Sequence, residues 1–524
     1  MVLRDDDLPV ELNLASWFVD RNVEESRGDR TALVTDERRT TYAELAALTN
    51  RVGNVLRELG VRPQQRLLLA LSDGVEFVAT WYGAQKIGAV TAEVYTYLRP
   101  KDYAYYLGYT EAEVVVADTT TFAGLREARA AEGRYLRQVL VVGVPEDELG
   151  PGELSFDALV DAASDDLDPA PTTRDDIAIW KFTTGSTGAP KACVHPTHSA
   201  LLSFDWYARS VLDVRDDDLV LPVPKLFFGY ARDLAALYPF GVGGAGILFP
   251  DRSTPERIFE LIARHRPTIL VNVPTMMSAM VTHPDAGEQD LGCLRLCTSA
   301  GEALPAELHR AWDRTFGVEV VDGIGSSEAY HIYISNRPGQ GRVGTVGQVV
   351  PGYTARVVDE AGTTVPDGEV GILEVTGETV ALEYWRAPEK SAATFRGDTV
   401  RTGDLFVRDA DGYFAYRGRT DDLLKVGGVW VAPSEVEHCL VGHPDVVECA
   451  VVGHEHDALV RPRAYVVLRA RADVSAESLI EYARSHLSPH KRPRDVVFVD
   501  ELPRTANGKL DRKALLALDR SRTP

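Results

Sequence analysis

The stretch that decides the fold is Lys181-Phe182-Thr183-Thr184-Gly185-Ser186-Thr187-Gly188-Ala189-Pro190-Lys191. Four hydroxyl side chains and two glycines fall within the six residues 183–188. The glycines permit backbone conformations that expose several N–H groups on one side. Such a nest of donors, with hydroxyls and the cation of Lys191, suits a triphosphate. The loop is not a Walker loop, because no Gly-Lys-Ser/Thr follows at the required spacing.

The residues before this loop decide between two interpretations of it. Clusters of Gly, Ser and Thr are also typical of solvent-exposed flexible loops. The apolar run Ile-Ala-Ile-Trp-Lys-Phe (177–182) leads directly into the loop. A strand that ends in a glycine-rich loop is a common way to present phosphate-binding N–H groups, so this run favours the phosphate site.

Length and composition limit the class of protein. The chain has 524 residues, which predicts two or more domains, and its 45% hydrophobic and 26% charged residues are typical of a soluble globular protein. A formal net charge of −22 argues against general nucleic-acid binding, although a local basic pocket can still hold a small phosphorylated ligand. The five cysteines lack zinc-site spacing and are expected to be thiols in a reducing cytoplasm.

Neither the start of the chain nor its longest uncharged stretch predicts a membrane segment. Met1–Asn13 is acidic and has no apolar core, unlike a signal peptide. Residues 234–250 carry no charge, but Pro239 and four glycines interrupt them. A membrane helix needs about 20 mostly apolar residues, so this stretch is interpreted as buried core. We expect a cytoplasmic protein with no membrane partner.

Helical and strand patterns alternate along most of the chain. Residues 41–60 show apolar spacings of three and four, with Thr41 and Glu44 forming a capping box. The apolar run 66–72 follows and predicts a buried strand. Repetition of this alternation predicts an α/β fold with layers of helices on parallel sheets.

The last third of the chain has a different pattern. Short strands separated by turns dominate residues 342–418, which predicts a small β unit. The charged, glycine-rich segment 417–428 then precedes a segment with its own helix and strand pattern. We therefore predict a large N-terminal domain (1–420) of layered α/β subdomains plus the small β unit, followed by a small α+β C-terminal domain (421–524).

The loop at 181–191 resembles the phosphate loop of the adenylate-forming superfamily, which includes acyl- and aryl-CoA ligases, adenylation domains of peptide synthetases and luciferases. Within this superfamily the sequence is most similar to benzoate–CoA ligases, through Lys225-Leu226-Phe227-Phe228 and Gly325–Ile332. Further motifs follow in family order and extend the resemblance over about residues 40–512: Ser299-Ala300-Gly301-Glu302, Asp322-Gly323-Ile324-Gly325-Ser326-Ser327-Glu328, Thr402-Gly403-Asp404, Gly418-Arg419-Thr420-Asp421-Asp422 and Pro503-Arg504-Thr505-Ala506-Asn507-Gly508-Lys509.

The resemblance implies an acid–thiol ligase. ATP would activate an aromatic, benzoate-like carboxylic acid as an acyl-adenylate with release of pyrophosphate, and the acyl group would then pass to coenzyme A. ATP, Mg²⁺ and coenzyme A are the implied cofactors and substrates. Two alternatives stay open: transfer to a carrier-protein phosphopantetheine, and use of another non-CoA nucleophile. A non-catalytic homologue is disfavoured because Lys509, Glu328, Asp404 and Arg419 are all retained. A homodimer is also left open.

The resemblance also assigns roles to single residues. Lys509 would bridge the carboxylate and the α-phosphate, carried into the site by a mobile C-terminal domain that rotates about a hinge at Asp421. Ser327 would contact the α-phosphate and Glu328 would ligate Mg²⁺. Gly427 and Gly428 would face the thiol in the rotated state. The implied ATP- and AMP-binding residues are Thr183, Thr184, Gly185, Ser186, Thr187, Gly188, Lys191, Ala300, Gly301, Glu302, Asp322, Gly323, Ile324, Gly325, Asp404 and Arg419.

The acid pocket is predicted from aromatic and glycine residues, a combination that suits a flat ring. Amino-acid-activating relatives usually have an aspartate where this chain has Gly229, which weighs against an α-amino acid. Segments 91–97 and 230–233 are more polar than usual and leave room for a hydroxyl or amino group on the ring. His331 either bonds such a group or is a packed core histidine. The pocket residues are Phe228, Gly229, Tyr230, Ser326, His331 and Ile332.

Overall fold

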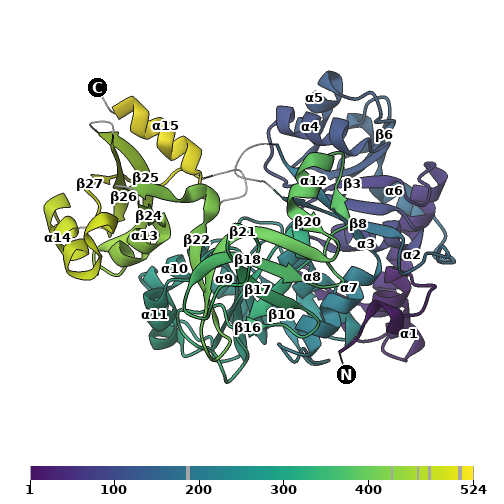
Figure 1. The fold of residues 1–524 in the computed structure, drawn as a ribbon. Coiled ribbons are helices and arrows are strands. Elements are labelled where there is room, and N and C mark those ends of the chain that lie inside the picture. Colours follow the sequence, from purple (N-terminus) through teal and green to yellow (C-terminus); the bar gives the residue numbers. More distant parts are fainter. Residues whose placement is uncertain are drawn as a thin grey trace.

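The computed structural model describes residues 2–183, 189–426, 429–456, 459–469, 472, 474–504 and 510–522. Figure 1 shows a large body, coloured purple to green, and a smaller lobe, coloured yellow-green, that carries α13 (Pro433–Val441), α14 (Ala476–His486) and α15 (Arg512–Arg522). The predicted fold class, a large α/β N-terminal domain and a small C-terminal domain, is confirmed.

The first large sheet has nine strands within the described residues, in the order β16-β15-β14-β13-β12-β10-β11-β1-β2. Its central strands are parallel, and β12 and β13 are buried along their whole length, as apolar runs with helices on both faces require. The strands are β1 (Thr31–Val34), β2 (Arg39–Thr41), β10 (Leu219–Pro222), β11 (Ala245–Ile247), β12 (Ile269–Asn272), β13 (Leu296–Ser299), β14 (Val320–Gly325), β15 (Ile332–Ser335) and β16 (Gln348–Val349).

The second large sheet has eight strands in the described part of the chain, in the order β19-β9-β8-β4-β3-β5-β6-β7. It contains the run 66–72 that was predicted as a strand, and it is parallel except at β8–β9 and β9–β19. The strands are β3 (Arg66–Ala70), β4 (Val90–Glu93), β5 (Val114–Asp118), β6 (Gln138–Val142), β7 (Glu153–Ser155), β8 (Ile177–Thr183), β9 (Lys191–Pro196) and β19 (Glu383–Tyr384).

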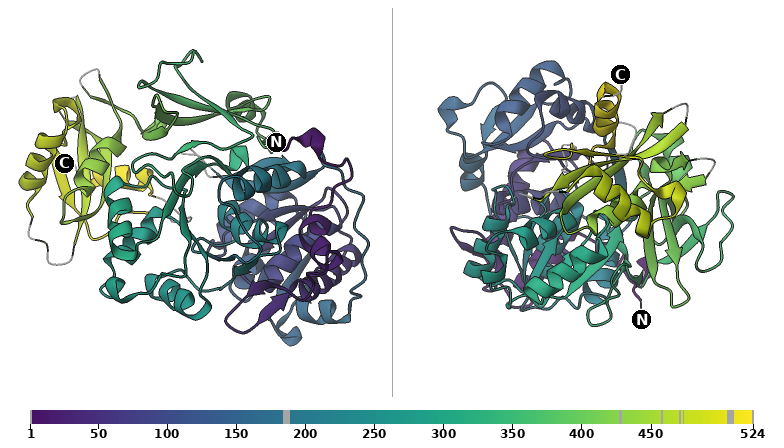
Figure 2. Two further views of the ribbon diagram at one scale, coloured as in Figure 1. Left: turned by 90° about the horizontal axis from the view of Figure 1, so that it is seen from below. Right: turned by 90° about the vertical axis from the view of Figure 1, so that its left-hand side faces the viewer.

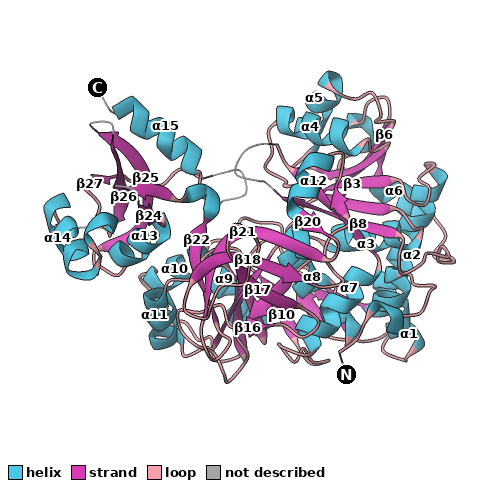
Figure 3. Ribbon diagram, in the orientation of Figure 1, coloured by secondary structure: helices cyan, strands magenta, loops and turns pink. Residues whose placement is uncertain are grey.

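Helices cover these sheets (Figure 3). The predicted helix at 41–60 is α2. The Thr41 hydroxyl caps it by accepting a hydrogen bond from the Glu44 backbone N–H at 3.2 Å, and the Glu44 carboxylate accepts one from the Thr41 backbone N–H at 2.8 Å. The helices of the body are α1 (Arg21–Glu24), α2 (Tyr42–Glu58), α3 (Val75–Lys86), α4 (Pro100–Thr110), α5 (Phe122–Ala131), α6 (Phe156–Ala162), α7 (His198–Ser203), α8 (Gly229–Ala236), α9 (Pro255–His265), α10 (Pro274–Thr282), α11 (Ala306–Phe316) and α12 (Pro388–Thr394).

The predicted small β unit forms an antiparallel sheet, and the C-terminal lobe has two further sheets. The left view in Figure 2 places this lobe at one side of the body, and in the right view the lobe faces the viewer. The β unit contains β17 (Thr354–Val358), β18 (Val370–Thr376), β20 (Phe395–Arg396), β21 (Thr399–Arg408) and β22 (Phe414–Arg419); the lobe contains β23 (Leu424–Val426), β24 (Val429–Val431), β25 (Val446–His456), β26 (Leu459–Leu468) and β27 (Asp495–Phe498).

The lobe joins the body through β22. The Ser434 hydroxyl of α13 donates to the Arg417 carbonyl at 3.1 Å, and the Arg512 guanidinium lies 3.3 Å from the Asp422 carboxylate. No helix in the described ranges has both the length and the apolar character that crossing a bilayer demands.

Candidate active site

The hairpin β8–β9 presents the predicted phosphate loop. Thr183 at the end of β8 pairs with Lys191 at the start of β9, so the two residues flank the loop. Thr184, Gly185, Ser186, Thr187 and Gly188 lie outside the described residues. The Lys191 ammonium lies 3.8 Å from the ring centroid of Tyr384, and burial lowers its pKa although the nearby Glu328 carboxylate opposes this effect.

A short 3₁₀ helix, η7 (Ser327–Ala329), brings two predicted catalytic residues to this hairpin. The Ser327 hydroxyl donates to the carbonyl of Phe182 at 3.4 Å, next to Thr183. The Glu328 carboxylate accepts a hydrogen bond from the Tyr384 hydroxyl at 2.7 Å. Ser326 caps the turn by accepting from the Ala329 N–H at 3.3 Å. The connection between β14 and β15 of the first sheet therefore meets β8 and β9 of the second sheet.

The predicted adenine-side residues follow two neighbouring parallel strands. Ala300, Gly301 and Glu302 come directly after β13, and Asp322 to Gly325 end β14, with Ser299 in register with Asp322. Gly301 has a φ of +86° and open space around it, and the Glu302 carboxylate accepts from the N–H and hydroxyl of Thr275 at 3.1 and 2.7 Å. Parallel strands end at one edge of a sheet, which is where such folds bind nucleotides.

The structure explains why a glycine stands at position 325 of β14 and shows how burial affects the carboxyl of Asp322. A Cβ at Gly325 would lie 2.4 Å from the His331 carbonyl oxygen, so only glycine allows this close approach between β14 and the start of β15. Asp322 is buried, and burial raises the pKa of its carboxyl to about 8. The carboxyl is therefore mostly protonated at neutral pH.

The predicted acid-pocket residues are brought together by α8 and the β14–β15 connection. Phe228 directly precedes α8, and Gly229 and Tyr230 form its first turn. The Tyr230 hydroxyl is 2.7 Å from the Thr298 hydroxyl on β13. Ile332, at the start of β15, is buried. The Tyr230 side chain of α8 thus reaches β13, whose end holds the adenine-side residues.

His331 is enclosed by aromatic rings. Its ring centroid lies 5.1 to 5.7 Å from those of Tyr207, Tyr230 and Tyr238. Burial, the largest effect, lowers its pKa to about 3, so the imidazole is neutral at pH 7. Its Nε2 is 3.4 Å from the Tyr230 carbonyl, and its Nδ1 has no hydrogen-bond partner among the described residues. A neutral ring with a vacant acceptor nitrogen is compatible with both predicted roles.

The predicted ATP- and AMP-binding residues Asp404 and Arg419 form an ion pair. Asp404 on β21 is in register with Arg419 on β22, and the guanidinium donates to its carboxylate at 3.0 Å. Asp421 follows in a short 3₁₀ turn that leads into the C-terminal lobe. Gly427, Gly428 and Lys509 lie outside the described residues.

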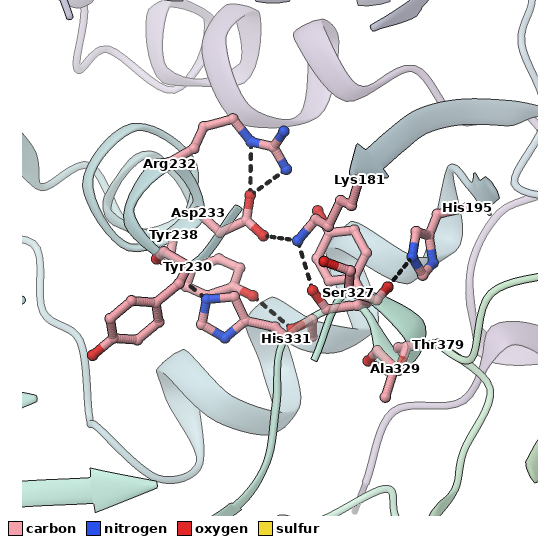
Figure 4. Close-up of polar contacts among 12 residues, drawn as sticks. Lys181, His195, Tyr230, Arg232, Asp233, Tyr238, Ser327, Ala329, His331 and Thr379 are labelled. Atoms are coloured by element: carbon pink, nitrogen blue, oxygen red, sulfur yellow. Dashed lines mark hydrogen bonds and ion pairs between the residues drawn. The ribbon is translucent and has the colours of Figure 1, made fainter. Parts of the chain in front are cut away.

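A buried charge network beside the acid pocket was not predicted (Figure 4). The Lys181 ammonium donates to the Asp233 carboxylate at 2.6 Å, and Arg232 donates to the other Asp233 oxygen at 2.7 and 3.0 Å. Arg232 also donates to the Glu93 carboxylate at 2.7 Å. All four side chains are at most 4% exposed. Lys181 and Glu93 are charges within apolar runs, which is the sequence signal that would have singled them out.

The network keeps its charges because they are paired. Burial lowers the pKa of Lys181 to about 8, against the opposing effect of Asp233. Burial alone would raise the pKa of Asp233, but Arg232 and Lys181 outweigh it and hold that pKa at about 2. Unpaired buried charges are costly, whereas these two cations and two anions compensate one another. Segments 91–97 and 230–233 were interpreted above as leaving room for a ring substituent. Their charged residues instead pair with each other and with Lys181.

The chain belongs to the AMP-binding enzyme family. The family's main domain matches residues 19–385 and its C-terminal domain matches residues 435–509. The predicted resemblance to adenylate-forming enzymes is thereby confirmed.

Several characterised relatives are similar over nearly the whole chain. The chain is 40% identical to a benzoate–CoA ligase of Thauera aromatica, covering 96% of each protein, and 39% identical to a 4-hydroxybenzoate–CoA/benzoate–CoA ligase of Rhodopseudomonas palustris, covering 96% of this chain and 94% of the relative. The structure of an anthranilate CoA ligase with anthranoyl-AMP superposes with a TM-score of 0.94 at 37% identity, covering 99% of both chains. A benzoate CoA ligase of Burkholderia xenovorans gives a TM-score of 0.88 at 39% identity, covering 96% of this chain and 99% of that one.

Proposed function

We propose that this protein is an AMP-forming aryl-CoA ligase. It activates a benzoate-like carboxylic acid with ATP, releases pyrophosphate, and transfers the acyl group from the adenylate to coenzyme A. The observation that carries this proposal is the meeting of the hairpin that flanks the phosphate loop, the Ser327–Glu328 turn and the aromatic start of α8 at one junction of two sheets.

The relatives support an aromatic acid as the substrate. Those described above are named for benzoate, 4-hydroxybenzoate and anthranilate. In this chain the corresponding wall is built from rings and glycine, because Tyr230 and His331 pack together and Gly229 has no side chain. Flat apolar walls with few polar groups suit an aryl ring.

Mg²⁺ fits the residues near the phosphate hairpin. Mg²⁺ is usually bound through one or two carboxylates together with substrate phosphates, rather than by an all-protein cage. Glu328 supplies one hard carboxylate oxygen oriented by Tyr384, and no cluster of three acidic or metal-ligating residues occurs within the described ranges. The ion would supply positive charge to the phosphates when bound, while Glu328 fixes its place and Lys191 adds a second cation.

Further parts of the proposal rest on the motifs. The boundary between the domains lies at 420/421, Asp421 is the hinge, Lys509 assists adenylation, and Gly427 and Gly428 border the thiol site. Ser327 contacts the α-phosphate, Asp404 binds the ribose hydroxyls, and Arg419 binds the ribose or a phosphate. A cytoplasmic location stays a prediction of the sequence, and a homodimer stays an open alternative.

A panel assay tests the function. Pyrophosphate release is measured with substituted benzoates, cinnamates and short fatty acids, with and without CoA, and the thioester is identified by mass spectrometry. We expect a benzoate to be the best substrate and CoA to be consumed. Faster release with fatty acids than with any aryl acid would refute the aromatic pocket. Adenylate formation without thioester would instead favour a carrier-protein acceptor.

A further inference from the structure

The turn at residues 327–330 is held by all four of its backbone carbonyls. The Ser327 carbonyl contacts the His195 ring nitrogen at 2.7 Å, and the Glu328 carbonyl accepts from the Ala381 N–H at 2.8 Å. The Ala329 carbonyl accepts from the Tyr353 and Thr379 hydroxyls, each at 3.0 Å, and the Tyr330 carbonyl accepts from the Lys181 ammonium at 2.7 Å. Lys181 is the one charged donor in this set.

Tyr330 is the residue of this turn that most needs an anchor. Its φ of +73° and ψ of −56° lie in a region that residues with a side chain rarely occupy, so the surrounding contacts must hold it there. Lys181 makes two contacts with this residue, because its ammonium also lies 3.4 Å from the Tyr330 ring centroid. Charge-assisted hydrogen bonds are stronger than neutral ones, which makes this anchor the strongest of the four.

Lys181 also connects this turn to the acid pocket and to the phosphate hairpin. It lies on β8, two residues before Thr183, and its partner Asp233 lies on α8, whose first turn carries Gly229 and Tyr230. Figure 4 shows Lys181 between Asp233 and the turn. A Cβ at Gly229 would lie 2.8 Å from the Lys181 Nζ, so the glycine leaves the path of this side chain open. One ammonium group thus sets the relative position of three parts of the site.

We propose that Lys181, fixed by Asp233, is a positioning residue for the adenylation half-reaction, holding the turn that carries Ser327 and Glu328 in register with the acid pocket on α8. This inference rests on the proposed function of the site. It predicts a larger defect in the first half-reaction, because the Mg²⁺ contact of Glu328 serves the pyrophosphate that leaves before thioester formation, whereas the α-phosphate contact of Ser327 persists in the adenylate.

The test compares two buried lysines in the full-length enzyme. Lys181→Met removes the ammonium at similar side-chain length, and Lys181→Gln retains an N–H donor. The matched control is Lys86→Met, because Lys86 is 3% exposed, pairs with Asp20 at 2.8 Å and lies outside the site. Each variant is assayed for pyrophosphate release, for thioester formation from a supplied aryl-adenylate and CoA, and for melting temperature.

We expect Lys181→Met to lower kcat for pyrophosphate release about 10- to 100-fold while thioester formation changes about twofold, and Lys181→Gln to recover part of the loss. Lys86→Met should lower the melting temperature without this split. Equal losses in both half-reactions, or a Lys181→Met enzyme no worse than Lys86→Met, would overturn the proposal. If Lys181→Met does not fold, Asp233→Asn and Lys181→Gln are judged by the same split. A wild-type enzyme that activates only non-aryl acids would refute the proposed function instead, and the variants would then be compared on the acid that it accepts.

Discussion

The two ends of the candidate site differ in how firmly they are held. At one end, the turn at 327–330 is fixed by every carbonyl, and the Lys181 side chain that anchors it is 4% exposed. At the other end, the Arg419 side chain on β22 is 40% exposed. It pairs with Asp404 on the neighbouring strand β21, and β22 leads towards the lobe. The groups that anchor the turn from behind are buried, whereas Arg419 beside the proposed hinge remains partly exposed.

This difference fits the demands of two successive reactions at one site. Phosphoryl chemistry depends on positioning and on preorganised charge, which a rigid, water-poor turn provides. A domain that rotates between half-reactions needs few and replaceable contacts with the body, such as the 3.1 Å hydrogen bond from the Ser434 hydroxyl to the Arg417 carbonyl. The following changes test the comparison, from the largest expected effect to the smallest.

Lys509→Ala tests what the C-terminal lobe brings to the rigid end. We expect adenylate formation to fall about 10³-fold, because one preorganised cation at the α-phosphate is lost. Thioester formation from a supplied aryl-adenylate should be largely spared. Pyrophosphate release and a CoA-consumption assay measure the two steps separately, and equal losses in both would contradict the assigned role.

Asp421→Pro tests the accessible end. Proline fixes φ and restricts the residue before it, so the lobe should rotate less freely. We expect thioester formation to fall about tenfold and adenylation to change less. Single-turnover measurements of each step check this, with Asp421→Ala as the control that keeps the backbone free. A proline variant equally slow in both steps would argue against a hinge at this position.

His331→Leu separates the two interpretations of the buried histidine. If the vacant Nδ1 accepts a hydrogen bond from a ring substituent, the preference for hydroxy- or aminobenzoates over benzoate should fall about 2- to 10-fold. The measurement is the ratio of kcat/KM values on paired substrates. An unchanged ratio with a lower melting temperature would show that His331 only packs against its tyrosine neighbours.

Asp322→Asn should change how stability depends on pH. Burial raises the pKa of this carboxyl to about 8 in the folded state, against about 3.9 when unfolded. Below pH 4 both states are protonated, and as pH rises towards 8 the unfolded state ionises first, so folded-state stability is lost. The variant should therefore melt above the wild type by a margin that grows from pH 5 to pH 8, by about 2 °C or more. Parallel melting curves would contradict this.

Much of the fold was predictable because it follows local rules. Helix α2 begins at its capping box, β3 follows from an apolar run, and the β unit follows from its turn-separated strands. Several predicted site residues in the described ranges also lie close together, since Ala300 to Glu302 and Asp322 to Gly325 follow or end neighbouring parallel strands and the Ser327 turn meets the hairpin β8–β9. The spacing of hydrophobic residues and the identity of the turn residues are sufficient to predict these helices and strands.

The charge network was not predictable in this way. The network joins three distant segments of the chain, which carry Glu93, Lys181 and the pair Arg232–Asp233. The sequence shows each as a charged residue beside apolar neighbours and does not show which charges pair. Only packing shows that the charges neutralise one another rather than face the substrate ring. The strained backbone of Tyr330 and its Lys181 anchor were hidden for the same reason.

The sequence by itself determined the family and the layered α/β fold, and it predicted a set of residues for ATP binding, because phosphate binding needs particular side chains at fixed local spacing. The tertiary structure alone decided how the turn carrying Ser327 and Glu328 is held. A buried ammonium is stable only where carboxylates and carbonyls from other elements surround it, and no local spacing encodes that meeting.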